Sequence, residues 1–271
     1  MDKYAVMGNP IGHSKSPDIH GRFAAQTQQN LSYEKILVKK DGFIDAVKVF
    51  GNQGGKGLNI TVPFKEEAWA LAHNKTEKAQ RAGAVNTLKF ETDGTILGEN
   101  TDGIGMVKDI TVNHQVSLKG KSILVMGAGG AVRGVLEPLI EQGPAQITIV
   151  NRTVTKAEIL AEVFSDLFPI QAIGYDQLPG QNFQIIINGS AASLQGELPP
   201  LPDAILAEGA LCYDMMYSSE PTPFMQWATQ QGAKKVVDGL GMLIEQAAES
   251  FFLWRKVKPD TATVIQTYRS K

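Results

Sequence analysis

Lys65 and Asp102 are the two charged residues whose types best suit proton transfer to or from a bound substrate. Lys65 lies in the segment LNITVPFK and Asp102 in the segment GENTDG. A helix expected at 64–72 places Lys65 in its first turn, where a cation opposes the helix dipole at a cost of about 0.3–1 kcal/mol. A carboxylate close by favours the charged lysine again, so the two influences together can tune a proton donor. A solvated surface lysine without a role is the alternative.

Uncharged polar side chains fall at the ends of predicted strands or in the loops after them, where ligands gather in open α/β sheets. Together with one cation and one carboxylate, these hydroxyl and amide groups suit a small polyhydroxylated acid. The residues are Ser14, Ser16, Asn59, Thr61, Asn86 and Asn100. Structural alternatives exist, with Ser16 as a helix cap, Thr61 before a helix that begins near Pro63, and Asn86 in a turn.

A glycine-rich turn, Gly127-Ala128-Gly129-Gly130, follows a predicted buried strand and precedes a predicted helix. A dinucleotide fingerprint requires this context. The glycines let the backbone approach a pyrophosphate, and free N–H groups at the helix N-terminus meet its charge. Val132 stands at the third glycine of the fingerprint, so we expect a slightly different packing of helix on strand. A plain connector is the alternative.

The next predicted strand ends in Asn151-Arg152-Thr153 and carries no acidic residue. An acid at this point binds the ribose 2′-hydroxyl of NAD, whereas a guanidinium forms a bidentate pair with the 2′-phosphate of NADP. Arg152 therefore favours NADP over NAD. The alternative is that Asn151 and Arg152 are ordinary surface residues and that Thr153 caps the following helix.

Other kinds of site find little support in the sequence. The histidines, which show no spacing typical of metal ligands and so predict no metal site, are His13, His20, His73 and His114. A net charge of −2 gives no electrostatic reason to expect nucleic acid or an anionic membrane as a partner. We expect a small-molecule partner instead.

Cysteine usage and hydropathy bear on the compartment. The single cysteine, Cys212, excludes an internal disulfide and suits a reducing cytoplasm. The first apolar run is too short for a signal peptide, and no run is long enough to span a membrane. We therefore expect a cytoplasmic protein, present as a monomer or a homodimer.

Short apolar runs alternate with segments of helical spacing, which predicts an α/β fold with parallel strands and a domain boundary between about 101 and 120. We expect strands at 4–7, 33–38, 57–61, 84–90, 121–126, 146–150, 184–188, 210–214 and 234–238. We expect helices at 17–29, 42–50, 64–72, 130–142, 154–163, 222–231, 239–256 and 260–269, the last one starting on Asp260.

Eight motifs run through the chain in a fixed order: GNPIGHSKSP, LNITVPFK, GAVNT, GENTDG, GAGGA, NRT, DMMY and DGLGMLIEQ. In order and approximate spacing they resemble the shikimate dehydrogenase family over essentially the whole chain. The resemblance implies an NADP-dependent oxidoreductase that reduces 3-dehydroshikimate to shikimate in the shikimate pathway of aromatic amino acid biosynthesis. It also implies an N-terminal α/β substrate domain of residues 1–101 and 239–271, to which the C-terminal helices return, and a Rossmann-like doubly wound NADP domain of residues 102–238.

The resemblance further implies a role for each matching residue. Lys65 and Asp102 would be the catalytic pair, with Lys65 donating a proton to the substrate carbonyl or supporting it electrostatically. Substrate would be bound by Ser14, Ser16, Asn59, Thr61, Asn86, Tyr217 and Gln246, with the two serines on the carboxylate. NADP would be bound by Gly127, Ala128, Gly129, Gly130, Ala131, Asn151, Arg152, Thr153, Met215 and Gly239.

One segment departs from the family pattern. The family commonly reads N-A-T-S-S-G where this chain has NGSAAS at residues 188–193. We expect Gly189 to add backbone freedom beside the cofactor.

Two alternatives to this function remain open. A broader quinate/shikimate dehydrogenase using NAD is one, and Arg152 argues against it. A non-catalytic metabolite-binding module is the other, and it would not need Lys65 and Asp102 together.

Overall fold

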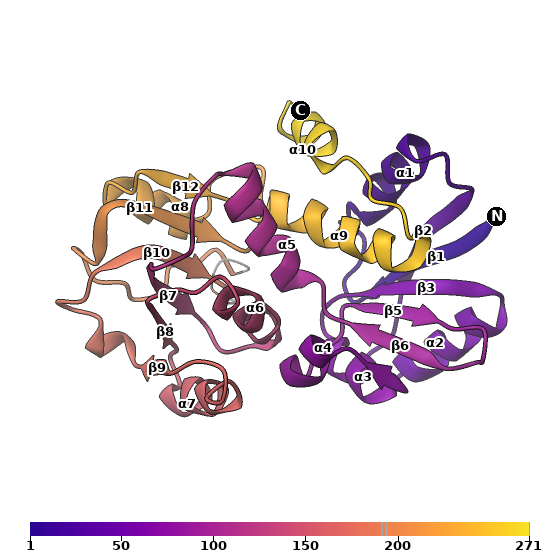
Figure 1. The fold of residues 1–271 in the computed structure, drawn as a ribbon, viewed down its shortest axis with the longest axis horizontal. Helices are drawn as coiled ribbons and strands as arrows, with labels where there is room; N and C mark the ends of the chain where they lie inside the picture. The colour runs from indigo at the N-terminus through magenta and orange to yellow at the C-terminus, as the bar shows by residue number, and fades with distance from the viewer. Residues whose placement is uncertain (191, 193–194, 271) are drawn as a thin grey trace. The chain divides into compact units, whose positions relative to one another are not determined.

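The computed structural model describes residues 1–190, 192 and 195–270. The chain divides into two compact units (Figure 1). Unit 1 comprises Met1–Gly105 and the segment from Leu243 onward, and unit 2 comprises Met106–Met242. The units meet in the chain after residues 105 and 242. The sequence predicts these junctions after residues 101 and 238, four residues earlier in each case. Within the described residues, no helix combines the length and the apolar character needed to cross a membrane.

Unit 1 contains a six-stranded mixed sheet in the order β2-β1-β3-β5-β6-β4. Its strands are β1 (Asp2–Gly8), β2 (Leu31–Leu37), β3 (Gly55–Ile60), β4 (Asn74–Lys75), β5 (Thr87–Phe90) and β6 (Ile96–Glu99). Strand β1 pairs in parallel with β2 and β3, while β5 runs antiparallel to β3 and β6. The carboxyl ends of β1 and β3 therefore meet at one edge of the sheet, which is where the predicted polar residues lie.

Helices cover both faces of this sheet because side chains along each strand alternate between the faces. Leu58 and Ile60 of β3 pack in a cluster with residues of three helices on one face. Gly57 faces the opposite way, and a Cβ there would lie 2.3 Å from Trp254 Nε1. The helices that lie wholly in unit 1 are α1 (Ser16–Gln26), α2 (Phe43–Asn52), α3 (Lys65–Leu71), α4 (Glu77–Ala82) and α10 (Thr261–Arg269). Helices α5 (Asp102–Lys108) and α9 (Leu240–Arg255) contain the two junctions between the units.

Unit 2 contains a six-stranded sheet, wholly parallel, in the order β9-β8-β7-β10-β11-β12. Numbered from β7, this is the order 3-2-1-4-5-6 of a doubly wound dinucleotide-binding fold. The strands are β7 (Ser122–Met126), β8 (Gln146–Val150), β9 (Ile170–Ile173), β10 (Phe183–Asn188), β11 (Leu206–Asp214) and β12 (Lys235–Val237). The expected fold class is confirmed.

Two apolar clusters cover the faces of the unit 2 sheet, because buried parallel strands are apolar on both sides. One cluster joins the strands to α6 (Gly130–Ile140) and α7 (Val154–Val163), and the other joins them to α8 (Pro223–Gln230). Cys212 lies in the second cluster, and burial raises the pKa of its thiol to about 12. The cysteine is therefore a small apolar core residue.

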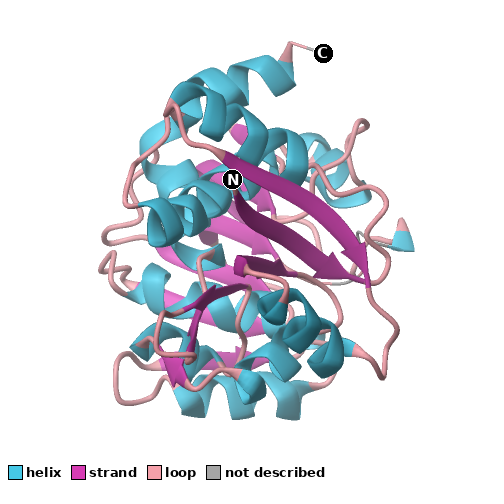
Figure 2. Cartoon of the chain, turned by 90° about the vertical axis from the view of Figure 1, so that its right-hand side faces the viewer, coloured by secondary structure: helices cyan, strands magenta, loops and turns pink. Residues whose placement is uncertain are grey.

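The predicted strands and helices are present, with ends that shift by a few residues, and further elements appear (Figure 2). The strand expected at 84–90 begins only at Thr87. The interval 101–120, expected as a boundary, holds α5 and a π-helix at Asp109–Asn113. The expected capping role of Ser16 is wrong: Lys15 holds the N-cap position and Ser16 is the first helical residue. Asp260 does cap α10, accepting a hydrogen bond from Ala262 N.

Candidate active site

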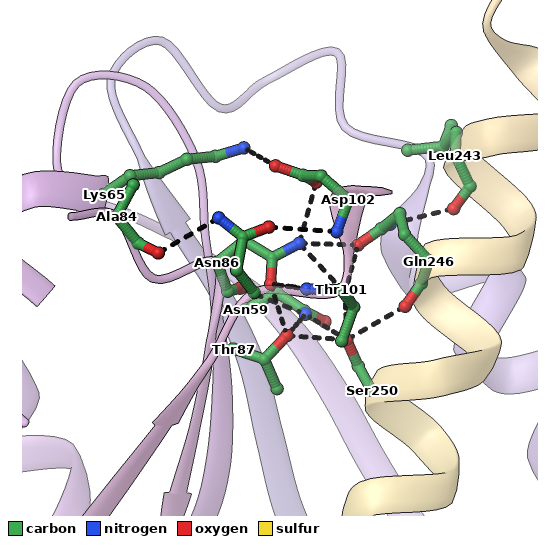
Figure 3. A network of polar contacts seen from close by, with 11 residues as sticks. Asn59, Lys65, Ala84, Asn86, Thr87, Thr101, Asp102, Leu243, Gln246 and Ser250 are labelled. Atoms are coloured by element: carbon green, nitrogen blue, oxygen red, sulfur yellow. Dashed lines mark hydrogen bonds and ion pairs between the residues drawn. The ribbon is translucent and has the colours of Figure 1, made fainter. Parts of the chain in front are cut away.

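Lys65 and Asp102 form an ion pair in unit 1 (Figure 3). Lys65 is the first residue of α3, within the first turn as the sequence predicts, and Asp102 is the first residue of α5. Lys65 Nζ lies 2.5 Å from Asp102 Oδ2. Asp102 is 6% exposed, whereas the Lys65 side chain is 21% exposed. The ammonium group thus remains accessible to a ligand while its carboxylate partner is mostly enclosed.

Asn86 fixes the orientation of the Asp102 carboxylate. The backbone N–H of Thr101 donates to Asn86 Oδ1 at 2.9 Å, and since a backbone N–H can only donate, this identifies the amide oxygen. Asn86 Nδ2 then faces Asp102 Oδ1 and donates to it at 2.8 Å. Each carboxylate oxygen of Asp102 therefore has its own donor, one from Asn86 and one from Lys65. Gln246 joins the same group, with its Oε1 3.3 Å from Asn86 Nδ2.

Asn59 lies below this group and is engaged by the protein at both ends of its amide. Burial raises the pKa of Tyr33 well above its usual value, so the phenol keeps its proton and donates to Asn59 Oδ1 at 2.8 Å. Asn59 Nδ2 donates to Ser250 Oγ at 2.9 Å and to Thr87 Oγ1 at 3.1 Å. A direct contact of Asn59 with substrate would require one of these bonds to break.

Ser14 lies in the loop between β1 and α1, and Ser16 is the first residue of α1. Ser16 N donates to Ser14 Oγ at 3.3 Å, which holds the two serines in one turn. The loop is fixed at two points, where Asn9 Nδ2 donates to a carbonyl after β2 and Lys35 Nζ donates to Gly12 O at 2.8 Å. The fixed loop therefore restricts the positions of the two serine hydroxyls.

Thr61 follows β3 directly and lies beside Gly8, the last residue of β1. A Cβ at Gly8 would lie 2.4 Å from Thr61 Cγ2. The glycine therefore allows the ends of the two strands to approach. Thr61 and the loop that starts at Gly8 share one edge of the sheet.

The glycine turn of unit 2 fits a pyrophosphate. Gly127 has a φ of 103°, which disfavours any residue with a side chain. A Cβ at Gly129 or Gly130 would meet nothing within 4 Å, so the turn is open. Helix α6 begins at Gly130, and its N-cap Gly129 has no side chain with which to bond the first N–H groups. Those N–H groups can therefore bind an anion.

Arg152 follows β8, next to this turn in the sheet order, and its side chain is exposed. Asn151 Nδ2 donates to Thr153 O at 2.8 Å, which shapes the short turn around the arginine. Thr153 holds the N-cap position of α7, but its side chain makes no capping hydrogen bond. Burial raises the pKa of Tyr175 to about 12, and the positive charge of Arg152 opposes that shift in part. An exposed guanidinium is thus available to a phosphate at this strand end.

Met215, Tyr217 and Gly239 lie in unit 2, after β11 and β12. Asp214 shapes this segment, since its Oδ1 accepts from Met216 N at 3.1 Å and its Oδ2 from Thr222 Oγ1 at 2.6 Å. A Cβ at Gly239 would lie 2.1 Å from Met215 O, so only glycine fits there. The backbone around Met215 is therefore tightly constrained.

Comparison with known proteins agrees with this geometry. Three family models match the chain: "Shikimate dehydrogenase substrate binding domain" at residues 6–88, "Shikimate / quinate 5-dehydrogenase" at 109–195 and "Shikimate 5'-dehydrogenase C-terminal domain" at 239–267. A shikimate dehydrogenase (NADP(+)) of Alkalilimnicola ehrlichii is 57% identical over 268 residues, covering 99% of this chain and 98% of the relative. The chain belongs to the shikimate dehydrogenase family.

Solved structures of similar proteins share the fold. An Ael1 enzyme from Pseudomonas putida is 47% identical, with a TM-score of 0.94 and 98% of each chain covered. The shikimate 5-dehydrogenase of Thermus thermophilus, solved with NADP(H) and shikimate, is 31% identical, with a TM-score of 0.88, covering 100% of this chain and 99% of that one. The architecture of the shikimate dehydrogenase family therefore extends along the whole described chain.

Sequence reasoning missed three hydroxyl residues of the network, namely Thr87, Thr101 and Ser250. The two threonines stand inside the quoted motifs GAVNT and GENTDG, next to residues that were selected. Ser250 had a weaker signal, as a lone hydroxyl four residues after Gln246 on a largely apolar helix. Residues four apart lie on one helix face, so Ser250 could have been grouped with Gln246.

The structure corrects the expected role of Gly189. Its φ is not positive, so backbone freedom is not what the position requires. A Cβ at Gly189 would lie 2.6 Å from Val132 Cγ2 and 2.8 Å from Met215 Sδ. Val132, which stands at the third glycine of the fingerprint, fills the space that a side chain at 189 would need. Positions 191 and 193 of the same departure lie outside the described residues.

His20 is fully buried in unit 1 and stacks on Tyr33, with ring centroids 4.2 Å apart and an interplanar angle of 7°. Burial lowers the pKa of His20 to about 3, opposed in part by the Asn59 amide. Its folded pKa thus lies below the unfolded value of about 6.5. Between these values only the unfolded chain binds the proton, so stability is full above pH 6.5 and falls as pH falls towards 3.

We expect His20→Phe to flatten this acid limb of the stability profile, because phenylalanine keeps the stacking and binds no proton. From pH 6.5 to pH 5, wild type should lose about 2 kcal/mol more free energy of unfolding than the variant, at about 1.4 kcal/mol per pH unit. Urea unfolding followed by tryptophan fluorescence measures this. His13→Gln, at an exposed histidine, is the control and should behave as wild type. Parallel profiles for wild type and His20→Phe would show that His20 does not titrate on unfolding.

Proposed function

We propose that this protein catalyses the reversible NADPH-dependent reduction of 3-dehydroshikimate to shikimate. The observation that carries the proposal is the Lys65–Asp102 ion pair, held by Asn86 at the strand ends of unit 1. An amide-lined cation beside a carboxylate can polarise a carbonyl and exchange a proton with it. Membership of the shikimate dehydrogenase family supports the choice of substrate.

In the proposed reaction the hydride comes from bound NADPH, and the residues of this chain handle the proton. The Lys65 ammonium hydrogen-bonds to the substrate carbonyl oxygen and donates a proton to it as that oxygen becomes a hydroxyl. Asp102 holds Lys65 in place through the ion pair. In the reverse direction Lys65 accepts the proton from the shikimate hydroxyl.

In the proposal, substrate is bound by a domain of residues 1–101 and 239–271, together with one tyrosine from the remaining residues. This domain matches unit 1 except for four residues at each junction. The fixed loop and the network around Asn86 support this assignment. The paired serines would bind the carboxylate through O–H donors, and the other side chains would bind the ring hydroxyls. The residues are Ser14, Ser16, Asn59, Thr61, Asn86, Gln246 and Tyr217.

Cofactor binding is assigned to residues 102–238 and the adjoining Gly239. The open glycine turn and the start of α6 support pyrophosphate binding, and Arg152 supports the 2′-phosphate of NADP. The residues are Gly127, Ala128, Gly129, Gly130, Ala131, Asn151, Arg152, Thr153, Met215 and Gly239. We further propose that the protein works in the cytoplasm, as a monomer or homodimer, with small molecules and not nucleic acid or membrane as partners.

The direct test is NADP⁺ reduction followed at 340 nm with shikimate, in parallel with NAD⁺ and with quinate. We expect turnover with shikimate and NADP⁺. When NAD⁺ replaces NADP⁺, or quinate replaces shikimate, kcat/KM should be at least about tenfold lower, because each replacement removes a polar contact with the protein or leaves a polar group unpaired.

The two alternatives give different results in the same assay. Similar rates with quinate and with NAD⁺ would indicate a broader quinate/shikimate dehydrogenase. Binding of shikimate and NADP⁺ by calorimetry, without turnover of any pair, would indicate a metabolite-binding module.

A further inference from the structure

Ser250 is a fully buried hydroxyl residue in the middle of α9, a helix otherwise largely apolar on its sheet side. Its Oγ lies 2.9 Å from Asn59 Nδ2, 2.7 Å from Thr87 Oγ1 and 3.3 Å from Thr101 Oγ1. These partners come from the end of β3, the start of β5 and the segment before α5. One helix hydroxyl thus meets three separate segments that surround the candidate active site (Figure 3).

The protons in this group can be assigned from what each atom is able to donate. A serine hydroxyl has one proton and can accept two hydrogen bonds. Asn59 Nδ2 can only donate, so Ser250 accepts from it. Thr87 Oγ1 lies 2.9 Å from Asn86 Oδ1, which can only accept, so the Thr87 proton points there. Ser250 has two near acceptors for its one proton, Thr87 Oγ1 at 2.7 Å and Gln246 O at 3.1 Å, and we assign the proton to the nearer one, Thr87.

This assignment produces a directed series of hydrogen bonds. It runs from Ser250 to Thr87, from Thr87 to Asn86 Oδ1, and from Asn86 Nδ2 to Asp102, which pairs with Lys65. Hydrogen bonds in such a series polarise and strengthen one another in a low-dielectric interior. The Thr101 N–H and the Thr87 hydroxyl both hold the Asn86 oxygen, and the second of these bonds depends on the Ser250 hydroxyl, which touches neither Asp102 nor Lys65.

We propose that Ser250 is a positioning residue that acts through Thr87 and Asn86 to hold Asp102 and Lys65 in their reactive arrangement. The proposal rests on the proposed function. Ser250 Oγ also lies 3.1 Å from Gln246 O, one helical turn earlier, but its single proton is engaged by Thr87, so this contact adds no second hydrogen bond. Replacing Ser250 by an apolar residue would leave Asn59 Nδ2 and Thr87 with fewer partners in a buried site, where unmade hydrogen bonds are costly.

The test is a double-mutant cycle between Ser250→Ala and Thr87→Val, which remove the two hydroxyls with little change of shape. Each single variant is expected to lower kcat/KM for shikimate about 5- to 20-fold. The KM for NADP⁺ should stay within about twofold of wild type, because the phosphate turn lies in unit 2. The double variant should lie within about twofold of the worse single one, because both changes break one series of hydrogen bonds. Thr87→Ser keeps the hydroxyl and should lose less activity than Thr87→Val.

Val264→Ala is the matched control, since Val264 is a buried residue of α10 outside the network. It should lower the urea midpoint at least as much as Ser250→Ala while keeping kcat/KM near wild type. Three results would overturn the proposal: activity of Ser250→Ala within about twofold of wild type, multiplicative losses in the double variant, or equal losses in Ser250→Ala and Val264→Ala at equal stability.

A crystal structure of Ser250→Ala tests the positioning without relying on turnover. We expect a turned Asn86 amide, or a Lys65 Nζ to Asp102 Oδ2 distance longer than 2.5 Å. If wild type fails to oxidise shikimate, the proposed function fails, and this structure still decides the role of Ser250. An unchanged Asn86–Asp102–Lys65 arrangement would contradict it.

Discussion

Replacing Lys65 by alanine is expected to lower turnover of shikimate at least ~100-fold, the scale on which general acid–base catalysis contributes. The variant loses the ammonium group 2.5 Å from Asp102 and with it the proton donor to the substrate oxygen. Binding of NADP⁺ should be nearly unchanged, because the phosphate turn and Arg152 belong to unit 2. Steady-state kinetics at 340 nm give kcat, and calorimetry gives the affinity for NADP⁺.

Lys89→Ala is the control for this experiment. Lys89 also belongs to unit 1 and also forms an ion pair, with Glu91, but it lies outside the network around Asn86. Its loss should leave kcat close to wild type, since this partly exposed ion pair touches none of the residues around Asn86. An equal loss of NADP⁺ affinity and turnover in Lys65→Ala would mean that Lys65 is misassigned.

Replacing Arg152 by glutamine should raise the KM for NADP⁺ about 10- to 100-fold, because a hydrogen bond to a charged group contributes about 1.5–3 kcal/mol. The KM for NAD⁺, which lacks the 2′-phosphate, should change little. The ratio of kcat/KM for the two cofactors is therefore the quantity to measure. High salt should weaken NADP⁺ binding to wild type more than to the variant.

Lys119→Gln serves as the control for Arg152→Gln. It removes one exposed positive charge from unit 2, just before the start of β7 and so at the opposite end of that strand from the glycine turn. Cofactor preference should be unchanged in this variant. A similar fall in NADP⁺ affinity in both variants would show that overall charge, and not a specific contact of Arg152, accounts for the preference.

Sequence patterns predicted the elements correctly where the local preference of the residues and their packing in the fold favour the same structure. The strand before Gly127 is a continuous apolar run followed by a glycine turn and a helix, and the structure contains all three. The next strand and helix have the predicted bounds, 146–150 and 154–163. Lys65 was placed correctly in the first turn of its helix because the apolar spacing after it is regular. The candidate pair Lys65 and Asp102 was chosen from residue type, from the place of Lys65 in a first helical turn and from the family resemblance, and the structure brings the two together.

The features that the sequence did not predict depend on packing between segments that are distant in the chain. Helix α5 contains two glycines, which lowers its intrinsic helix propensity, and the sequence predicted no helix there. A Cβ at Gly105 would lie 2.6 Å from Gln246 N, so the glycine is required by α9 and not by a turn. Ser250 and Gly189 were missed or misread for the same reason, since their partners, Asn59 and Val132, are far away in the chain.

The return of α9 to unit 1 has a consequence for the order in which the protein forms during synthesis. The hydrogen bond between Asn59 and Ser250 joins residues 191 positions apart, with all of unit 2 encoded between them. A ribosome releases the residues of unit 2 before it releases α9, so unit 2 can fold while unit 1 is still incomplete. Until α9 emerges, Asn59, Thr87 and the aromatic face around His20 have no cover. Nascent chains should therefore depend on chaperones for unit 1 longer than for unit 2.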